Sequence, residues 1–268
     1  MHEVHVRGLP PWLGPAPLLG EGAWTVARSD VRVDWVAQLM TAEAADLEAR
    51  LRRLVIAGHP VEVEVNPALR RTAQRRARLE DARRRRDTTA GFDRRECRYD
   101  EEGRWSLTPS SLALELGERA AGHPVLDLGC GVGGNTIGFA RAGARVVAVE
   151  RDPRRLGHAR HNARVYGVED RVEFVEGDAM SLLERYPGHL AFVDPPWGGE
   201  ARAQSTSLSA LPLLESTLAR RPRPARVWAK VPVSFALDQA PPCEVEAVFG
   251  RAEGDRRWIK FLWLRFSL

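Results

Sequence analysis

The fold of this 268-residue chain is decided by residues 125–135, which read VLDLGCGVGGN. Four strand-forming residues run directly into a glycine-rich turn, and a helical stretch begins where the turn ends. Glycines allow a sharp backbone turn and let a ligand approach the main chain closely. Because ordinary strand-to-helix loops also use glycine, the turn predicts a ligand site only if the neighbouring strands agree with it.

Strands and helices alternate regularly from residue 125 onward. Apolar runs predict parallel strands at Val125–Leu128, Arg145–Val149, Val172–Val175, Leu190–Val193 and Arg226–Val231. The helical stretches Asn135–Arg141 and Pro153–Tyr166 lie between them. Such alternation is typical of a doubly wound, Rossmann-like α/β domain whose parallel sheet is covered on both faces. The strand-like segments Cys243–Phe249 and Trp258–Phe266 are separated by a short polar turn, which predicts an antiparallel C-terminal hairpin at one side of the sheet.

The N-terminal part of the chain has a different composition. Residues 1–66 mix prolines, tryptophans and short apolar runs. Thr41–Leu54 reads as an amphipathic helix with Thr41 as its N-cap, and valines alternate with glutamates over residues 61–65, as in a strand. We therefore predict a small mixed α/β domain over residues 1–96 and a larger domain over residues 97–268.

Arginine dominates residues 67–98, where Pro67 is expected to open a helix at its first turn. The chain has a net charge of +4 and a pI of about 9.3, so a polyanionic partner such as RNA is permitted. Two interpretations stay open. Either the arginines of this helix pair with RNA phosphates, or the helix is a solvated charged face in a chain that is rich in arginine throughout.

Other features of the sequence exclude several classes of protein. No run of about 18 apolar residues occurs, so we expect no transmembrane helix, and we do not expect the proline-containing N-terminus to be a signal peptide. Cys97, Cys130 and Cys243 are odd in number and far apart, which supports neither a disulfide framework nor a metal site. We therefore expect a cytoplasmic protein that binds no metal.

Carboxylates follow the next two predicted strands. Glu150 lies about 20 residues beyond the glycines, where doubly wound folds place an acid that accepts hydrogen bonds from ribose hydroxyls, and Asp178 could accept from an adenine amino group. Asp127 lies before the glycines, where it would repel a pyrophosphate but suit the ammonium group of a methionine moiety. The alternative is that Asp127 only binds loop amides. This sign of charge favours S-adenosylmethionine over a nicotinamide dinucleotide as the ligand.

The run DPPWGG at residues 194–199 follows the fourth predicted strand. Two prolines remove two donors and stiffen the backbone, so the carbonyls of Asp194 and Pro195 and the Asp194 carboxylate are free to accept hydrogen bonds. Acceptors that hold both N–H groups of an exocyclic amine orient its nitrogen and stabilise the positive charge that develops during methyl transfer. Trp197 offers a face on which a base can stack. A structural proline turn with a buried tryptophan is the alternative.

Several separated motifs resemble the trimethylguanosine synthase family of RNA cap guanine-N2 methyltransferases. They are residues 131–137 (GVGGNTI), 152–153 (DP), 161–163 (HNA), 165–167 (VYG) and 195–199 (PPWGG), with 100–103 (DEEG) and 106–109 (SLTP) upstream. The resemblance covers residues 97–268 but does not extend over residues 1–90. It implies a class I methyltransferase fold with a seven-stranded sheet, an upstream segment that lies over the cofactor, and a guanine stacked on Trp197.

Three positions depart from the pattern of that family. Asp194 stands where the family usually has a serine, Arg104 replaces an aromatic residue and Ser110 replaces a glutamate. A 7-methylguanosine cap is a cationic base that needs aromatic side chains around it, so these departures argue against cap recognition. We therefore expect a plain guanine in ribosomal or transfer RNA as the acceptor.

Together these observations predict an S-adenosylmethionine-dependent N-methyltransferase that acts on guanine N2 in RNA. The alternatives are methylation of adenine N6, of a small molecule or of a protein side chain, and a non-catalytic RNA-binding protein. The expected catalytic residues are Asp194, Pro195, Pro196 and Trp197. The expected cofactor-binding residues are Trp105, Thr108, Asp127, Gly129, Gly131, Asn135, Thr136, Glu150, Arg151, Asp178, Ala179 and Asp194. Thr108 is also expected to cap the next helix, and Lys230 is expected either to contact a substrate phosphate or to lie on the surface.

Overall fold

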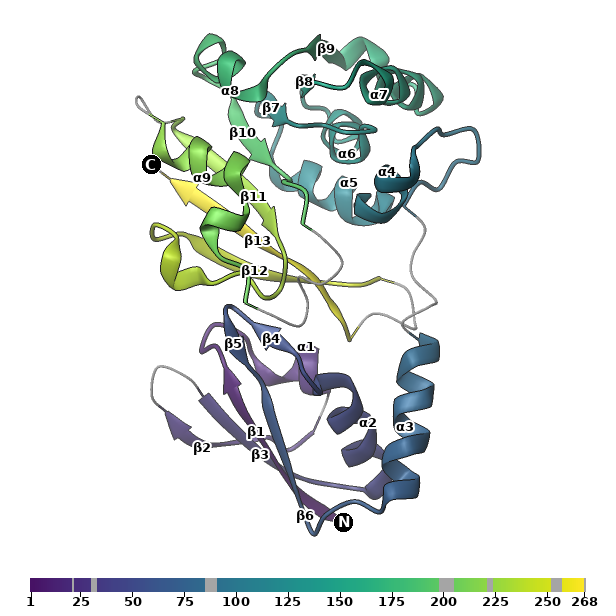
Figure 1. Ribbon diagram of the computed structural model, residues 1–268, viewed down its shortest axis with the longest axis vertical. Coiled ribbons are helices and arrows are strands. Elements are labelled where there is room, and N and C mark those ends of the chain that lie inside the picture. The colour runs from purple at the N-terminus through teal and green to yellow at the C-terminus, as the bar shows by residue number, and fades with distance from the viewer. Residues whose placement is uncertain are drawn as a thin grey trace.

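The computed structural model describes residues 1–20, 22–29, 33–84, 91–197, 205–220, 224–251 and 257–267. Two β-sheets follow one another along the long axis of the molecule, with the N-terminal sheet at the bottom of Figure 1 and a larger sheet at the top. None of the helices in the described ranges combines the length with the hydropathy that a membrane span requires. The predicted site residues belong to the larger sheet.

The larger sheet has seven strands in the order β12-β13-β11-β10-β7-β8-β9. Its strands are β7 (Val125–Leu128), β8 (Val146–Glu150), β9 (Val172–Glu176), β10 (Leu190–Val193), β11 (Arg226–Val231), β12 (Glu244–Phe249) and β13 (Ile259–Ser267). The strands β7 to β11 are parallel, whereas β13 runs antiparallel to β11 and β12 runs antiparallel to β13. The doubly wound, Rossmann-like sheet and its C-terminal hairpin are thereby confirmed, with strand bounds that differ from the predicted ones by no more than one residue.

Helices cover both faces of this sheet, as predicted. The helices α5 (Ser110–Arg119), α6 (Gly134–Arg141) and α7 (Pro153–Val165) pack on one face, and α8 (Ala179–Leu182) and α9 (Pro212–Ala219) pack on the other. The remaining short elements are α4 (Glu101–Ser106), η1 (Glu169–Arg171), η2 (Leu183–Arg185), η4 (Leu208–Ala210) and η5 (Leu237–Gln239). Strand alternation decides which core each side chain joins. In β10, Leu190 and Phe192 lie under α5–α7, whereas Ala191 and Val193 lie under α8 and α9.

The helices α5 and α6 approach each other backbone to backbone. A Cβ atom at Gly138 would lie 2.2 Å from the carbonyl oxygen of Ala113, and a Cβ atom at Gly117 would lie 2.4 Å from the carbonyl oxygen of Gly138. No side chain fits at such distances, so this packing requires glycine at both positions. The close approach fixes α6, which begins at the glycine-rich turn, against the helix that precedes β7.

The N-terminal sheet has four antiparallel strands in the order β2-β3-β1-β6. Its strands are β1 (His2–Leu9), β2 (Thr25–Ser29), β3 (Val33–Leu39) and β6 (Glu62–Asn66). The other elements of this part are α1 (Pro15–Leu19), α2 (Thr41–Leu51), α3 (Arg71–Arg84) and the ribbon of β4 (Val55–Ile56) with β5 (His59–Pro60). The helix α2 packs between the sheet and α3 (Figure 1). The mixed α/β character expected of this part is confirmed.

Two helix starts were predicted wrongly. Met40, not Thr41, is the N-cap of α2, because the carboxylate of Glu43 accepts a hydrogen bond from the Met40 amide at 3.0 Å. The Thr41 hydroxyl is instead hydrogen bonded to Nε2 of His2 at 3.1 Å. Pro67 lies in the turn before α3 rather than in its first turn, and its carbonyl is bound by Nδ1 of His2 at 2.6 Å. Both contacts are made by one side chain, that of His2 in β1, which no local pattern could indicate.

The N-terminal part contacts the loop that follows β11. The amide of Ala57 donates a hydrogen bond to the carbonyl of Val233 at 2.9 Å, and Gly58 lies so close to Ala236 that a Cβ atom would be 2.9 Å from its Cα. Buried apolar side chains of both parts form one continuous cluster. This loop lies at the carboxyl ends of the parallel strands, so the N-terminal sheet is held beside that edge. The predicted boundary between residues 96 and 97 stays a prediction.

Gly138→Ala tests the backbone contact between α5 and α6. We expect the substitution to lower the free energy of unfolding by about 1–3 kcal/mol, the usual cost of forcing a methyl group into a packed interior, measured by urea denaturation. Gly157→Ala in α7 is the matched control, because this glycine is also helical and a Cβ atom there would have nothing within 4 Å of it. That control should be stabilised by up to about 1 kcal/mol. Equal effects of the two substitutions would contradict the contact.

Candidate active site

Polar side chains from successive parallel strands gather at the carboxyl edge of the larger sheet. Asp127 belongs to β7, Glu150 ends β8, and Asp194 follows β10. Because β7, β8 and β10 are parallel neighbours, these carboxylates lie on the same edge. Hydrogen bonds link all three to the segment that leads from the glycine-rich turn into α6. The structure thus joins residues that are up to 67 positions apart in the chain, from 127 to 194.

Glu150 fixes the shape of the glycine-rich turn. One of its carboxylate oxygens accepts a hydrogen bond from the Gly131 amide at 3.0 Å, and the other accepts from the Asp152 amide at 3.0 Å. Gly131 has a φ of 56° and Gly133 a φ of 90°, in the left-handed region that glycine adopts without strain. The same carboxylate therefore joins the loop after β7 to the loop after β8.

Asp127 is a buried carboxyl group without a cation beside it among the described residues. It is 1% exposed, and one of its oxygens accepts a hydrogen bond from the Thr136 hydroxyl at 2.5 Å. Burial raises the pKa of Asp127 to about 7; the Thr136 hydrogen bond opposes this rise, and repulsion from Asp194 and Glu150 adds to it. Its hydrogen-bond partners are thus the hydroxyl and the backbone amide of Thr136, at the start of α6.

A segment upstream of β7 lies against the glycine-rich turn and the start of α6. Asn162 of α7 is fully buried and connects the upstream segment to the turn. Its side chain accepts a hydrogen bond from the Arg98 amide and donates to the Arg98 carbonyl, at 2.7 Å each, and it also donates to the Val132 carbonyl at 2.9 Å. Leu107, which follows α4, packs against the start of α6. A Cβ atom at Gly134 would lie 2.4 Å from the Leu107 side chain. Sequence reasoning noted Asn162 only as part of a motif and missed this role.

Two buried polar atoms beside the turn have no hydrogen-bond partner among the described residues. They are Oγ1 of Thr108, whose residue is 2% exposed, and Oδ1 of Asn135. The expectation that Thr108 caps α5 was wrong, because Pro109 occupies the N-cap position and no side chain caps that helix. Leaving a buried polar atom unpaired costs about 1–3 kcal/mol. A ligand that pairs with these atoms would remove that cost.

Lys230 has a role in the site that the sequence did not predict. It is 4% exposed, and its Nζ lies 2.8 Å from Oδ2 of Asp194 and 3.4 Å from the Ser106 carbonyl. Oδ2 of Asp194 also accepts a hydrogen bond from Nδ2 of Asn135 at 2.8 Å. Both expectations for Lys230 were therefore wrong. It is not a surface lysine, and its ammonium group is paired with Asp194 rather than free to bind a phosphate. The available signal was a lysine inside the apolar strand Arg226–Val231.

Residues 195–197 of the run DPPWGG differ in their exposure. Pro195 is buried, Pro196 is exposed and Trp197 is half-buried. The Nζ atom of Lys230 lies 5.3 Å from the centroid of the Trp197 ring, so the indole packs over the ion pair without being enclosed by the protein. Trp197 also packs against both hydrophobic clusters, so a structural proline turn remains the alternative interpretation. Gly198 and Gly199 lie outside the described residues.

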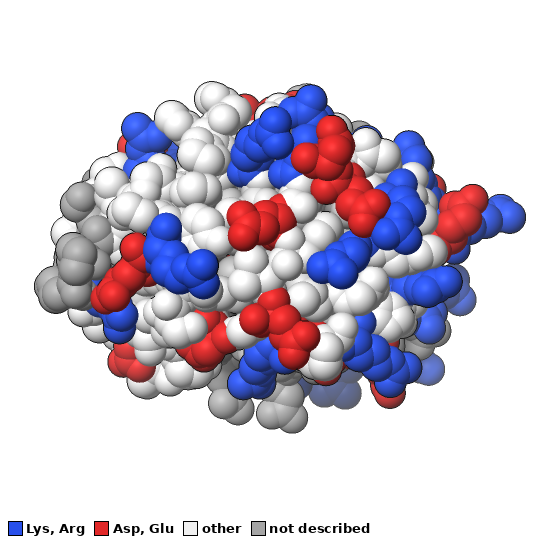
Figure 2. Space-filling model, turned by 90° about the horizontal axis from the view of Figure 1, so that it is seen from above, with Lys and Arg blue, Asp and Glu red and all other residues white. Residues whose placement is uncertain are grey.

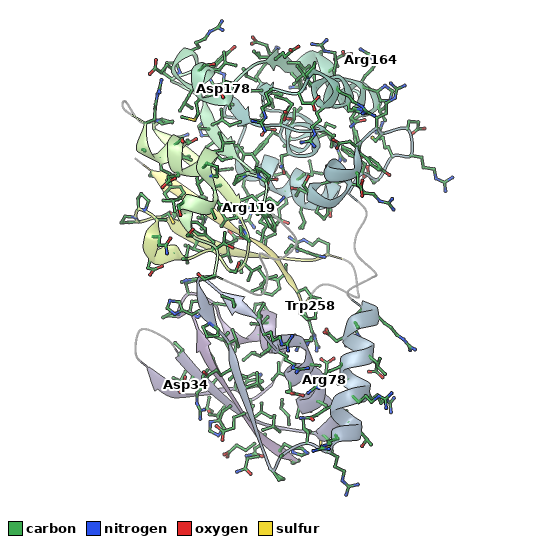
Figure 3. The ribbon with its side chains drawn as sticks, in the orientation of Figure 1. Asp34, Arg78, Arg119, Arg164, Asp178 and Trp258 are labelled. Carbon is green, nitrogen blue, oxygen red and sulfur yellow. The ribbon has the colours of Figure 1, made fainter. Side chains whose placement is uncertain are left out.

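Other predicted residues lie at this edge without contacts to the cluster. Asp178 is exposed, and its Oδ1 caps α8 by accepting from the amides of Met180 and Ser181 at 2.9 and 3.0 Å (Figure 3). Ala179 begins that helix, and Arg151 is exposed. The amide of Gly129 donates to the Val149 carbonyl at 2.9 Å. The side chain of Trp105 lies outside the described residues.

Metal ligands do not cluster in the ranges that the structure describes. No group of three or more His, Cys, Asp or Glu side chains there could hold a metal ion. The expectation of a metal-free site stays a prediction. The chemistry of the described cluster rests on carboxylates, one buried lysine and backbone carbonyls.

Comparisons with known proteins show several similarities, one of which is assigned to a stretch of this chain. A sequence model described as RNA cap guanine-N2 methyltransferase matches residues 122–213. Trimethylguanosine synthase of Schizosaccharomyces pombe is 31% identical over 120 residues, which are 41% of this chain and 50% of that protein. Trimethylguanosine synthase of Saccharomyces cerevisiae is 32% identical over 105 residues, which are 35% of this chain and 33% of that protein. A crystal structure of an RNA methyltransferase from Salinibacter ruber in complex with S-adenosyl-L-homocysteine is 25% identical, with 60% of this chain and 92% of that chain covered and a TM-score of 0.38.

The matched segment contains the glycine-rich turn and the catalytic loop. It ends before β11, so Lys230 lies beyond it. The matches with the two trimethylguanosine synthases span half or less of the length of those proteins. The resemblance to the RNA cap guanine-N2 methyltransferase family that the motifs predicted is therefore confirmed, with residues 122–213 as the segment that matches the model of that family.

Proposed function

We propose that this chain transfers the methyl group of S-adenosylmethionine to an exocyclic amino group, with guanine N2 in RNA as the acceptor. The observation that carries this proposal is the cluster at the carboxyl edge of the sheet. There Asn135 links the helix after the glycine-rich turn directly to Asp194 of the catalytic loop at 2.8 Å. A cofactor on the turn and an acceptor on the loop would therefore be neighbours.

The groups around the glycine-rich turn fit this cofactor. Asp127 is a buried acid with a raised pKa, and a cationic ammonium group beside it would favour its ionised form. The oxygens of Thr108 and Asn135, unpaired among the described residues, are free to accept from a ligand donor. Glu150 and Thr136 fix the turn and the Asp127 carboxyl, and Asp178 remains the candidate for the adenine amino group. When bound, the sulfonium supplies an activated methyl group, so that in-line positioning accounts for most of the catalysis.

The catalytic loop supplies acceptors for an amino group. In the described part of the chain, Oδ1 of Asp194 accepts no hydrogen bond, because Lys230 and Asn135 both bind Oδ2. Oδ1 and the Pro195 carbonyl can therefore each accept one N–H of the acceptor amine. The carboxylate also stabilises the positive charge that develops on the nitrogen. The methylated ammonium group is acidic, so its proton leaves without a strong base.

Lys230 is a positioning residue for this step. An ionised carboxylate that is half enclosed by protein needs a partner, and the lysine ammonium supplies it. Because Lys230 binds Oδ2 alone, it also holds the carboxylate in one orientation. The result is a charged acceptor whose free oxygen points away from the lysine.

The structure supports a plain guanine more than a methylated cap. Arg104 is exposed on α4, and Ser110 accepts a hydrogen bond from Arg141 at 3.0 Å. Neither residue provides an aromatic wall, so only Trp197 of these positions can stack on a base. Neutral guanine stacks on a single aromatic face, whereas a cationic base gains most from being enclosed by several. Adenine N6, a small molecule and a protein side chain remain the alternatives.

The direct test is incubation of the purified protein with labelled S-adenosylmethionine and total RNA, followed by nucleoside analysis. Label on N2-methylguanosine is expected. Label on N6-methyladenosine alone would overturn the guanine proposal and keep the amino-group chemistry. Calorimetric titration with the cofactor tests the enzyme proposal separately, because absence of heat at millimolar cofactor would point to a degenerate, non-catalytic fold.

Asp127→Asn tests the buried acid. In the unfolded chain Asp127 ionises near its ordinary pKa of 3.8, whereas in the folded protein it keeps its proton up to about pH 7. The stability of the native protein therefore falls as the pH rises through this window, by about 4 kcal/mol because each pKa unit corresponds to about 1.4 kcal/mol. Asparagine does not titrate, so the variant should gain stability relative to the native chain from pH 4 to pH 7. Urea denaturation across that range measures the difference, and a constant difference would contradict the raised pKa.

Asp194→Asn tests the acceptor carboxylate. We expect kcat to fall about 10²-fold, because a neutral amide stabilises the developing charge less well, while calorimetry shows little change in cofactor affinity. Asp170→Asn, an exposed acid at the opposite edge of the sheet, is the matched control and should keep full turnover. Unchanged turnover in Asp194→Asn would refute the role.

Lys230→Met extends this test to the positioning residue. Without the neighbouring ammonium group the Asp194 carboxylate loses the contact that orients it, so kcat should fall about tenfold or more while the KM for RNA and the calorimetric affinity for the cofactor stay near the native values. Loss of cofactor affinity or of thermal stability in parallel with kcat would instead indicate a merely structural lysine.

Trp197→Ala tests the stacking surface. Base stacking on an aromatic ring is worth about 1–3 kcal/mol, so the KM for RNA should rise about tenfold while cofactor affinity stays the same. Trp197→Phe keeps an aromatic face and should recover most of the loss. Selective loss of cofactor affinity in Trp197→Ala would reverse the assignment.

A further inference from the structure

The positive charge of this chain is concentrated in one segment. Residues 67–98 contain twelve arginines against five acidic residues, whereas the rest of the chain contains 28 basic and 31 acidic residues. The described part of this segment includes α3. The question is which of its arginines serve the fold and which are free to bind a partner.

The structure separates the arginines of α3 into two groups. Arg78 pairs with Glu48 at 3.4 Å and Arg84 pairs with Asp46 at 2.7 Å, so both fasten α3 to α2. Arg76 pairs with Glu80 along the helix itself at 3.1 Å. These three arginines are compensated by neighbouring acids, so they explain part of the charge without any partner.

Arg71 and Arg75 are different. Both are exposed, and in the described ranges neither forms an ion pair. They are four residues apart, so they lie on the same stripe of the helix. The opposite stripe carries Ala77 and Asp81, which are buried. Two uncompensated cations therefore point away from the protein on one face of α3.

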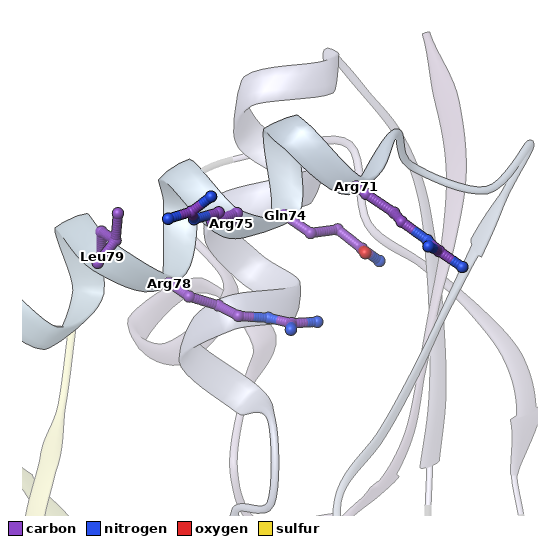
Figure 4. Close-up of a pocket in the computed structure, with 5 residues that line it drawn as sticks. All are labelled: Arg71, Gln74, Arg75, Arg78 and Leu79. Carbon is purple, nitrogen blue, oxygen red and sulfur yellow. The ribbon is translucent and has the colours of Figure 1, made fainter.

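These two arginines line a hollow on the surface. The hollow has a volume of about 460 Å³ and is lined by Arg71, Gln74, Arg75, Arg78 and Leu79 (Figure 4). Leu79 is 57% exposed. Guanidinium groups pair with phosphates, the Gln74 amide can donate or accept, and an exposed leucine offers an apolar surface to a base or a ribose. This combination matches a nucleotide strand better than a small anion.

The hollow is also held in a fixed place relative to the catalytic edge. The helix α3 packs on α2, and the N-terminal sheet beneath is anchored through Ala57 and Gly58 to the loop after β11. The helix stands on the same side of the molecule as α4, whose following residues cover the glycine-rich turn (Figure 1). On the described part of the far end of the molecule, acidic and basic side chains are interspersed instead (Figure 2).

We propose that the α3 hollow binds the sugar-phosphate backbone of a single-stranded segment of the RNA substrate. This inference rests on the proposed function for the identity of the methylated base, but binding itself needs no methyl transfer. Arg71 and Arg75 contact phosphates, Arg78 supports them from the rim, and Leu79 packs against a base or a ribose. An acidic protein segment is the competing partner.

The test is a double variant, Arg71→Gln with Arg75→Gln, in the full chain. Affinity is measured by fluorescence anisotropy with an unstructured, labelled RNA of about 16 nucleotides, near the upper end of known single-strand site sizes. Loss of two phosphate contacts should weaken binding about tenfold or more and should reduce the slope of log K against log salt by about 1.4. The matched control is Arg145→Gln with Arg171→Gln, two exposed arginines at the opposite edge of the sheet, which should change neither quantity.

Each outcome decides the proposal separately from the enzyme activity. Weaker binding and a lower salt slope in the α3 variant, with unchanged cofactor affinity by calorimetry, support the hollow as the RNA site even if no methyl transfer is found. Unchanged RNA affinity in a variant that melts at the native temperature overturns the proposed RNA site. This holds even if the protein is found to methylate RNA. Equal losses in the α3 variant and in the control would also overturn it, because they would show that only net charge matters.

Discussion

The ion pair between Lys230 and Asp194 is the contact on which the site depends. Taking two charges out of water costs several kcal/mol per ion, and removal of one partner from a buried pair typically costs about 3–5 kcal/mol. The pair joins the end of β10 to β11, and hydrogen bonds from the same atoms reach the last turn of α4 and the first turn of α6. Four segments are therefore held in one arrangement by one pair of charges.

Asp127 shows the opposite solution to the same problem. It is more deeply buried than Asp194, yet among the described residues it has a hydroxyl rather than a cation as its partner. The protein lowers the cost of burial by keeping this carboxyl protonated up to about pH 7. At one edge of the sheet, Asp194 is therefore paired with a cation at the place where an amine would be methylated. Asp127 has no cation as a partner among the described residues, at the place where a cationic ligand would bind. This difference follows from burial and partners, since both residues are aspartates.

The fold was predictable because its signals are local. Apolar runs and glycine-rich turns located β7, β8 and β10 to within one residue, and alternation along each strand accounts for the two cores. The errors occurred where a partner is distant in sequence. The Thr41 hydroxyl binds His2 instead of capping α2, and Lys230 in an apolar strand gains its role from Asp194, 36 residues earlier. No pattern within β11 indicates an acid in another loop.

The role of the arginines in residues 67–98 also depends on partners that are distant in the sequence. Its composition alone suggested either an RNA-binding helix or a solvated one, and α3 turns out to contain arginines of both kinds. Arg78 and Arg84 are matched by acids of α2 and hold the helix in place, which leaves Arg71 and Arg75 without a partner among the described residues. A methyltransferase site that holds one base must leave the rest of a polynucleotide outside, where only phosphates and exposed base faces are offered. Uncompensated arginines on α3, a helix that packs on α2, meet that requirement, since phosphate contacts fix the register and orientation of a strand without reading its sequence.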